Sequence, residues 1–132
     1  MTNARAQATT TEAAFAGRID VIRARFALKL ADKIQQTDAA LAQMAGDGSE
    51  AVDAVATAYR WFHDTGGIGQ VVGFGATGLQ AQACATILVG PFRAQRGLSV
   101  HELALLTSGL ESLRTIALGE THSSKSIQGP AS

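Results

Sequence analysis

The chain has 132 residues, and its 11 basic and 11 acidic side chains give a formal net charge of zero near pH 7, which argues against a surface for nucleic acid or an anionic membrane. A chain of this length is expected to form one domain with one core, and its one cysteine, Cys84, excludes an intramolecular disulfide and disfavours a cysteine-built zinc site. No apolar run approaches the roughly 20 residues that span a bilayer, and the N-terminus lacks the layout of a signal peptide, so we expect a cytoplasmic protein.

The first third of the chain has helical periodicity. Apolar side chains recur at intervals of three and four from Ile19 to Met44, which predicts one long amphipathic helix over about residues 18–45, ended by Gly46-Asp47-Gly48-Ser49. Thr9 and Glu12 have the spacing of a capping box, which indicates a separate short helix around residues 9–16.

Three further helices are expected. The second starts near Glu50, capped by Asp47 or Ser49, runs through His63, and bends or ends near Gly73. The third covers residues 77–89 and ends at Gly90-Pro91. Ser99-Val-His-Glu102 has the form of a capping box that opens a fourth helix, whose apolar positions are Leu103, Leu106, Leu110, Leu113 and Leu118.

Amphipathic helices joined by short connections predict an all-α fold, an antiparallel four-helix bundle with a short extra N-terminal helix. We expect an N-terminal extension over residues 1–14, the bundle over residues 15–118, and a flexible tail rich in Ser, Gly and Thr over residues 119–132. Trp61, Phe62 and Phe26 are expected in the core, Cys84 as a small buried group, and His101 and His122 as solvated surface residues.

His63 is the candidate functional residue. On a helix, Gly67 lies about 40° from it and Gln70 about 20° on the other side, whereas Trp61, Ile68 and Val72 lie roughly 140–180° away. The imidazole is therefore expected to face solvent. Residues 66–78 contain six glycines, each costing about 1 kcal/mol relative to alanine inside a helix, which indicates a close approach to the backbone.

This segment resembles the histidine-containing phosphotransfer (HPt) domains of multistep phosphorelays. The family pattern has glycine four residues after the histidine and Gly followed by Ala, Leu or Phe at the tenth and eleventh positions, matched here by Gly67 and by Gly73-Phe74. Arg60 stands three residues before His63, as in many family members. The similarity covers roughly residues 15–115, and only the central motif is specific.

The resemblance implies that His63 accepts a phosphoryl group from the aspartyl phosphate of a response-regulator receiver domain and passes it on. A free imidazole, with a pKa of about 6.5, is largely neutral near pH 7 and nucleophilic. The chain would be a monomeric carrier without autonomous catalysis, binding no metal or cofactor itself, with Mg²⁺ on the receiver and possibly a hybrid histidine kinase as a second partner. The residues expected to contact the partner are Tyr59, Arg60, Gly66, Gly67 and Gln70.

Three other interpretations stay open at this point. The family commonly has Leu-Lys where this chain has Thr65-Gly66, which favours an HPt fold that docks partners without being phosphorylated. In the dimerising histidine helix pair of sensor kinases an acidic residue often follows the histidine, as Asp64 does here, which favours a domain of that class. The segment Gly73–Gly78 matches G-x-G-x-x-G, a dinucleotide-binding loop if residues 70–72 form a strand.

Overall fold

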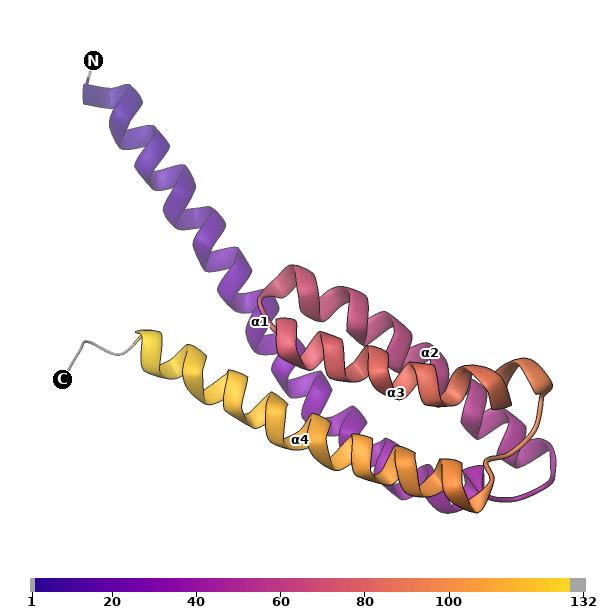
Figure 1. Ribbon diagram of the computed structural model, residues 1–132. Coiled ribbons are helices and arrows are strands. Elements are labelled where there is room, and N and C mark those ends of the chain that lie inside the picture. Colours follow the sequence, from indigo (N-terminus) through magenta and orange to yellow (C-terminus); the bar gives the residue numbers. More distant parts are fainter. Residues whose placement is uncertain (1, 129–132) are drawn as a thin grey trace.

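The computed structural model describes the backbone of residues 2–128 and the side chains of residues 13–122. Within residues 2–128 the fold is all-helical, with four helices and no strand (Figure 1). The helices are α1 (Thr2–Met44), α2 (Ser49–Val72), α3 (Gly75–Ala94) and α4 (Val100–Gln128).

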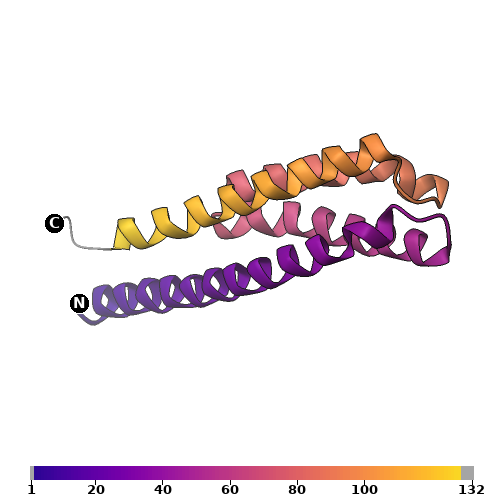
Figure 2. The same cartoon turned by 90° about the horizontal axis from the view of Figure 1, so that it is seen from below.

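Successive helices run in opposite directions, and each packs against its neighbours in the chain, with α4 returning to α1 (Figures 1 and 2). α2 and α3 form the most extensive contact. The α1–α2 and α3–α4 connections meet at one end, where the Leu98 amide donates to the Met44 carbonyl at 2.7 Å. At the other end α1 and α4 extend beyond the α2–α3 hairpin (Figures 1 and 2).

The core lies between the helices, where each contributes one apolar face. Leu30 and Ile34 come from α1, Phe62 from α2, and Leu88 from α3, all buried. On α4 the buried leucines are Leu106, Leu110 and Leu113, as expected, with Leu103 partly buried. The expectation for Leu118 was wrong, since it is 56% exposed and Ala117, one residue earlier, faces the core.

The sequence placed the helix ends near Gly46 and Gly73 correctly, and the structure gives the reason for the second. Gly73 ends α2 in the left-handed conformation, with φ of 89°, which glycine adopts without steric cost. The N-cap of α2 is Gly48 and not Asp47 or Ser49. Asp47 stands one residue too early for this role, and Ser49 is already the first helical residue.

The capping box of α4 is confirmed. The Ser99 amide donates to the Glu102 carboxylate at 2.9 Å, and the Glu102 amide donates to the Ser99 hydroxyl at 3.1 Å. Arg96 adds a bidentate ion pair to Glu102, at 2.7 and 2.9 Å. These contacts hold the pKa of Glu102 at about 2, first through the Arg96 hydrogen bond and then through the Ser99 amide.

Three helices are longer than the sequence predicted. α1 is continuous from Thr2, so the expected separate helix around residues 9–16 is its first part. α3 passes through Gly90-Pro91 and ends only at Ala94, followed by the C-cap Gln95 in the left-handed conformation with φ of 53°. Proline removes one amide hydrogen bond, but here Pro91 is buried and its own carbonyl accepts the Arg96 amide at 3.1 Å, so the last turn is retained.

α4 also continues past Gly119 to Gln128, where the sequence predicted a flexible tail over residues 119–132. The Glu120 carboxylate accepts the Thr77 amide in the first turn of α3, at 2.6 Å. A carboxylate at a helix N-terminus satisfies a free amide and complements the helix dipole. This contact ties the extension of α4 to the rest of the molecule. The end of the expected tail, residues 129–132, lies outside the described residues.

Candidate functional site

His63 lies in the middle of α2 on its solvent-exposed side. The buried side of the helix carries Val55, Ala58, Phe62, Gly66 and Gly69. Phe62 is fully buried beside the exposed His63. The packing of the buried side of α2 therefore fixes the backbone at His63, while the His63 side chain stays exposed to solvent.

The side of α2 opposite His63 is only partly covered. Val72 is buried and Trp61 partly buried, as the helical geometry predicts, but Ile68 is 50% exposed. The contact of α1 with α2 is much less extensive than that of α3. Apolar burial on α2 is therefore centred on the face toward α3.

Tyr59, one turn before His63, stacks on the imidazole. The two ring centroids lie 6.0 Å apart with an interplanar angle of 18°. Tyr59 also stacks on Phe92 of α3, with centroids 4.5 Å apart and an angle of 16°. The Arg60 guanidinium lies 5.8 Å from the centroid of the Phe92 ring. We call Phe92, Tyr59 and His63 the aromatic column.

Phe92 was not predicted from the sequence as a residue of this site. It lies 33 positions after Tyr59, beyond Gly90-Pro91, where the third helix was expected to end. Because α3 runs on to Ala94, Phe92 projects from its last turn against α2. The only sequence signal was an aromatic residue directly after the expected helix end.

Gly67 leaves open space beside His63. A Cβ atom added at Gly67 would have nothing within 4 Å, and the residue is exposed. Its backbone is therefore accessible on the side of α2 that carries the histidine. Gln70 is exposed one turn further along.

Gly66, in contrast, faces α3. A Cβ atom there would lie 2.6 Å from Cγ of Gln82 and 3.3 Å from the Gly78 carbonyl oxygen. At Gly69 an added Cβ would lie 3.0 Å from the Phe74 carbonyl oxygen, and at Gly78 it would lie 2.9 Å from the Gly66 carbonyl oxygen. These three glycines let α2 and α3 pack closely, so the close approach expected from the glycine-rich segment is that of α3 itself.

The sequence-predicted site residues thus divide into two groups. Tyr59, Arg60 and Gly67 lie one turn from His63 and Gln70 lies two turns from it, and all but the partly buried Tyr59 are exposed. Gly66 is buried in the α2–α3 contact. Its glycine is explained by helix packing.

Arg60 and Asp64 are exposed charges flanking His63 on α2, three residues before it and one after. Arg60 is held beside the aromatic column by its contact with Phe92. A guanidinium at this position can attract a phosphate or carboxylate group that approaches the histidine.

Residues 73–78 do not form a dinucleotide-binding loop. Gln70 to Val72, the required strand, belong to the end of α2, and the glycine motif forms the turn into α3. The Gly78 amide donates to the Phe74 carbonyl at 2.8 Å. The strand-loop-helix context that the motif needs is therefore absent from this segment.

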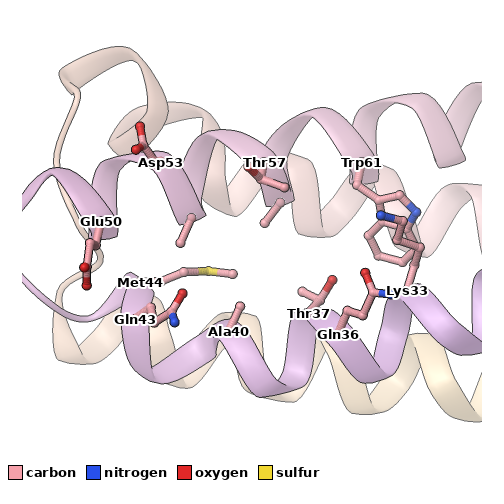
Figure 3. A pocket seen from close by; sticks show the side chains of 12 residues that line it. Lys33, Gln36, Thr37, Ala40, Gln43, Met44, Glu50, Asp53, Thr57 and Trp61 are labelled. Atoms are coloured by element: carbon pink, nitrogen blue, oxygen red, sulfur yellow. The ribbon is translucent and has the colours of Figure 1, made fainter.

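A groove of about 490 Å³ opens between α1 and α2, on the side of α2 that carries Trp61 (Figure 3). Trp61 lies at one end, beside Lys33 of α1, and Glu50 and Asp53 lie toward the other. The Met44 side chain lies in the space between the two helices. None of the site residues predicted from the sequence lines this groove.

Other candidate residues fall where the sequence placed them. His101 and His122 are exposed, and Cys84 is fully buried, which raises the pKa of its thiol to about 11. Over the described part of the chain, no group of three or more His, Cys, Asp or Glu side chains is arranged to hold a metal ion. None of the helices there combines the length and apolarity needed to cross a membrane.

Comparisons with protein-family models, with characterised proteins and with solved structures give no match for this chain.

Proposed function

We propose that this chain is a histidine phosphotransfer protein and that its helices form an antiparallel four-helix bundle of the HPt type. His63 would accept a phosphoryl group from a receiver-domain aspartyl phosphate and return it to an aspartate of the same or another receiver. The observation that carries the proposal is the exposed His63 in the middle of α2, beside the open position of Gly67.

The chemistry requires little else from this chain. The unprotonated ring nitrogen of His63 attacks phosphorus in line with the aspartyl oxygen. The P–N bond forms, the P–O bond breaks, and the aspartate leaves as a carboxylate while the other ring nitrogen keeps its proton. The Mg²⁺ of the receiver would neutralise the phosphoryl oxygens, because phosphoryl transfer depends mainly on positioning and charge neutralisation.

The accessibility of the α2 backbone near His63 favours a phosphoacceptor role over that of a surface histidine without function. A receiver must bring its phosphoaspartate to His63, so its loops must approach the backbone of α2. The open space over Gly67, where an added Cβ atom would meet nothing within 4 Å, leaves the backbone of α2 accessible for that approach. Arg60, exposed on the preceding turn, supplies a cation for the incoming phosphoryl group.

The test is transfer of labelled phosphate. Purified receiver domains, each carrying radiolabelled phosphate on its aspartate, are mixed singly with this protein in the presence of Mg²⁺. We expect at least one receiver to lose its label to the wild type within minutes. No transfer from any receiver of a broad panel would contradict the proposal.

A docking protein that is never phosphorylated is the second candidate. It is favoured by Gly66, which stands where the family commonly has lysine and faces α3. This alternative predicts receivers that bind to the protein, measured by calorimetry, while transferring no label. Loss of label to the wild type would exclude it.

A further inference from the structure

The aromatic column gives His63 a fixed neighbour on one ring face. We propose that Tyr59, backed by Phe92, is a positioning residue that holds the plane of the imidazole for phosphoryl transfer; this rests on the proposed function. The ring centroids of Tyr59 and His63 lie 6.0 Å apart, and their planes are 18° from parallel. This is the offset geometry that aromatic pairs prefer.

Orientation matters because the lone pair of the attacking nitrogen lies in the plane of the imidazole. In-line attack therefore requires that this plane contain the phosphorus atom. The side chain of an isolated surface histidine samples several rotamers, and only some of them meet this condition. A stacked neighbour reduces that freedom before the donor arrives, which lowers the entropic part of the barrier.

Tyr59 can act in this way because it is itself held. It is partly buried against the core and lies 4.5 Å from Phe92, centroid to centroid. Phe92 belongs to the turn of α3 that follows Pro91, so the continuation of α3 supplies the support. The Arg60 guanidinium lies near the Phe92 ring. Tyr59 and Phe92 are thus packed against the core, whereas His63, the third ring of the column, is exposed.

The kinetic test separates positioning from docking. Initial rates of transfer from one labelled receiver are measured over a range of receiver concentrations for the wild type, Tyr59→Phe, Tyr59→Leu and Phe92→Leu. Here kcat is the rate constant of transfer at saturating receiver, and KM is the receiver concentration that gives half of it. We expect Tyr59→Leu to lower kcat roughly three- to tenfold, the range that a stacked aromatic pair can supply, with KM nearly unchanged. Tyr59→Phe keeps the stack and should match the wild type, and Phe92→Leu should fall between.

Two kinetic outcomes would overturn the inference. An unchanged kcat in Tyr59→Leu would show that the stack has no role in transfer. A raised KM with an unchanged kcat would make Tyr59 a docking contact. Helical circular dichroism, recorded well below the unfolding temperature, checks that each variant is folded.

A second measurement needs no receiver. The chain has three histidines, and His101 and His122 are exposed, so their imidazole proton signals serve as internal references by NMR. Removing the Tyr59 ring current in Tyr59→Leu should move the His63 signals and leave the other two in place. If the His63 signals do not move, the stack is absent in solution and the inference fails. If they move but the wild type accepts no phosphate, the stack exists and the proposed function is what fails.

Discussion

At the scale of single residues, two adjacent glycines of α2 have opposite surroundings. Gly67 and Gly66 are neighbours in α2, yet an added Cβ meets nothing within 4 Å at Gly67 and meets Gln82 at Gly66. Sequence alone showed only a cluster of glycines around the histidine. It could not separate the glycine that leaves room for a partner from those that leave room for α3, because that depends on the direction in which α3 packs.

Gly67→Leu tests the role of this open position. Gly67 is exposed and an added Cβ atom meets nothing within 4 Å, so α2 should fold normally and keep its circular dichroism. The leucine side chain would stand beside His63 and obstruct an approaching receiver, so we expect transfer of labelled phosphate to fall at least tenfold. Normal transfer rates in a folded Gly67→Leu protein would show that the receiver does not need the open position at Gly67 to reach His63.

Gly67→Ala is the matched control for the stability of α2 when residue 67 carries a side chain. Alanine favours a helix by about 1 kcal/mol over glycine, and it meets no neighbour here. The variant should unfold at a higher urea concentration than the wild type.

At the scale of helices, the contact between α2 and α3 depends on small residues on both sides. Gly78→Ala would place a Cβ atom 2.9 Å from the Gly66 carbonyl oxygen, a backbone atom that cannot move aside without displacing α2. Overpacking of this kind costs about 1–3 kcal/mol. We expect a lower free energy of unfolding in urea, in contrast to the gain in Gly67→Ala. A Gly78→Ala protein as stable as the wild type would show that the helices are less closely packed.

Glu102 links the start of α4 to the preceding loop. Its pKa in the folded protein, about 2, lies below the ordinary value of 4.5 for a glutamate side chain. The charged form therefore stabilises the fold above pH 4.5, and this contribution is lost as the pH falls toward 2. Glu102→Gln should therefore be less stable than the wild type at pH 7, and the difference in unfolding temperature should shrink between pH 4.5 and 2.

A control for Glu102 lies on the same helix. Glu111 forms an exposed ion pair with Arg114, three residues later, and exposed pairs contribute little to stability. Glu111→Gln should change the unfolding temperature at pH 7 less than Glu102→Gln does. Equal effects of the two substitutions would show that the capping box adds nothing beyond an exposed charge.

The helices were predictable where local chemistry determines them. The Ser99–Glu102 capping box, the glycine cap at Gly73 and the leucine face of α4 all follow from short-range rules and appear in the structure. The errors occur where distant contacts override a local signal. Pro91 does not end α3 because that turn packs against Tyr59, and Gly119 does not end α4, where Glu120 caps α3.

At the scale of the whole molecule, the candidate site lies on the α2–α3 hairpin and not on the parts of α1 and α4 that extend beyond it. His63 lies within the part of α2 that packs on α3, whereas α1 and α4 extend beyond this hairpin (Figures 1 and 2). The position of His63 on the exposed side of α2 was predictable from helical periodicity. The aromatic column was not, because it joins α2 to a turn of α3 that the sequence did not indicate.

His63 is the proposed carrier of the phosphoryl group. The most direct test of this role compares labelling of the wild type with that of His63→Gln, His101→Gln and His122→Gln by the same phosphorylated receiver in Mg²⁺. We expect an acid-labile, alkali-stable label on every protein except His63→Gln, which should keep its helical circular dichroism. Label that persists in folded His63→Gln would contradict the claim.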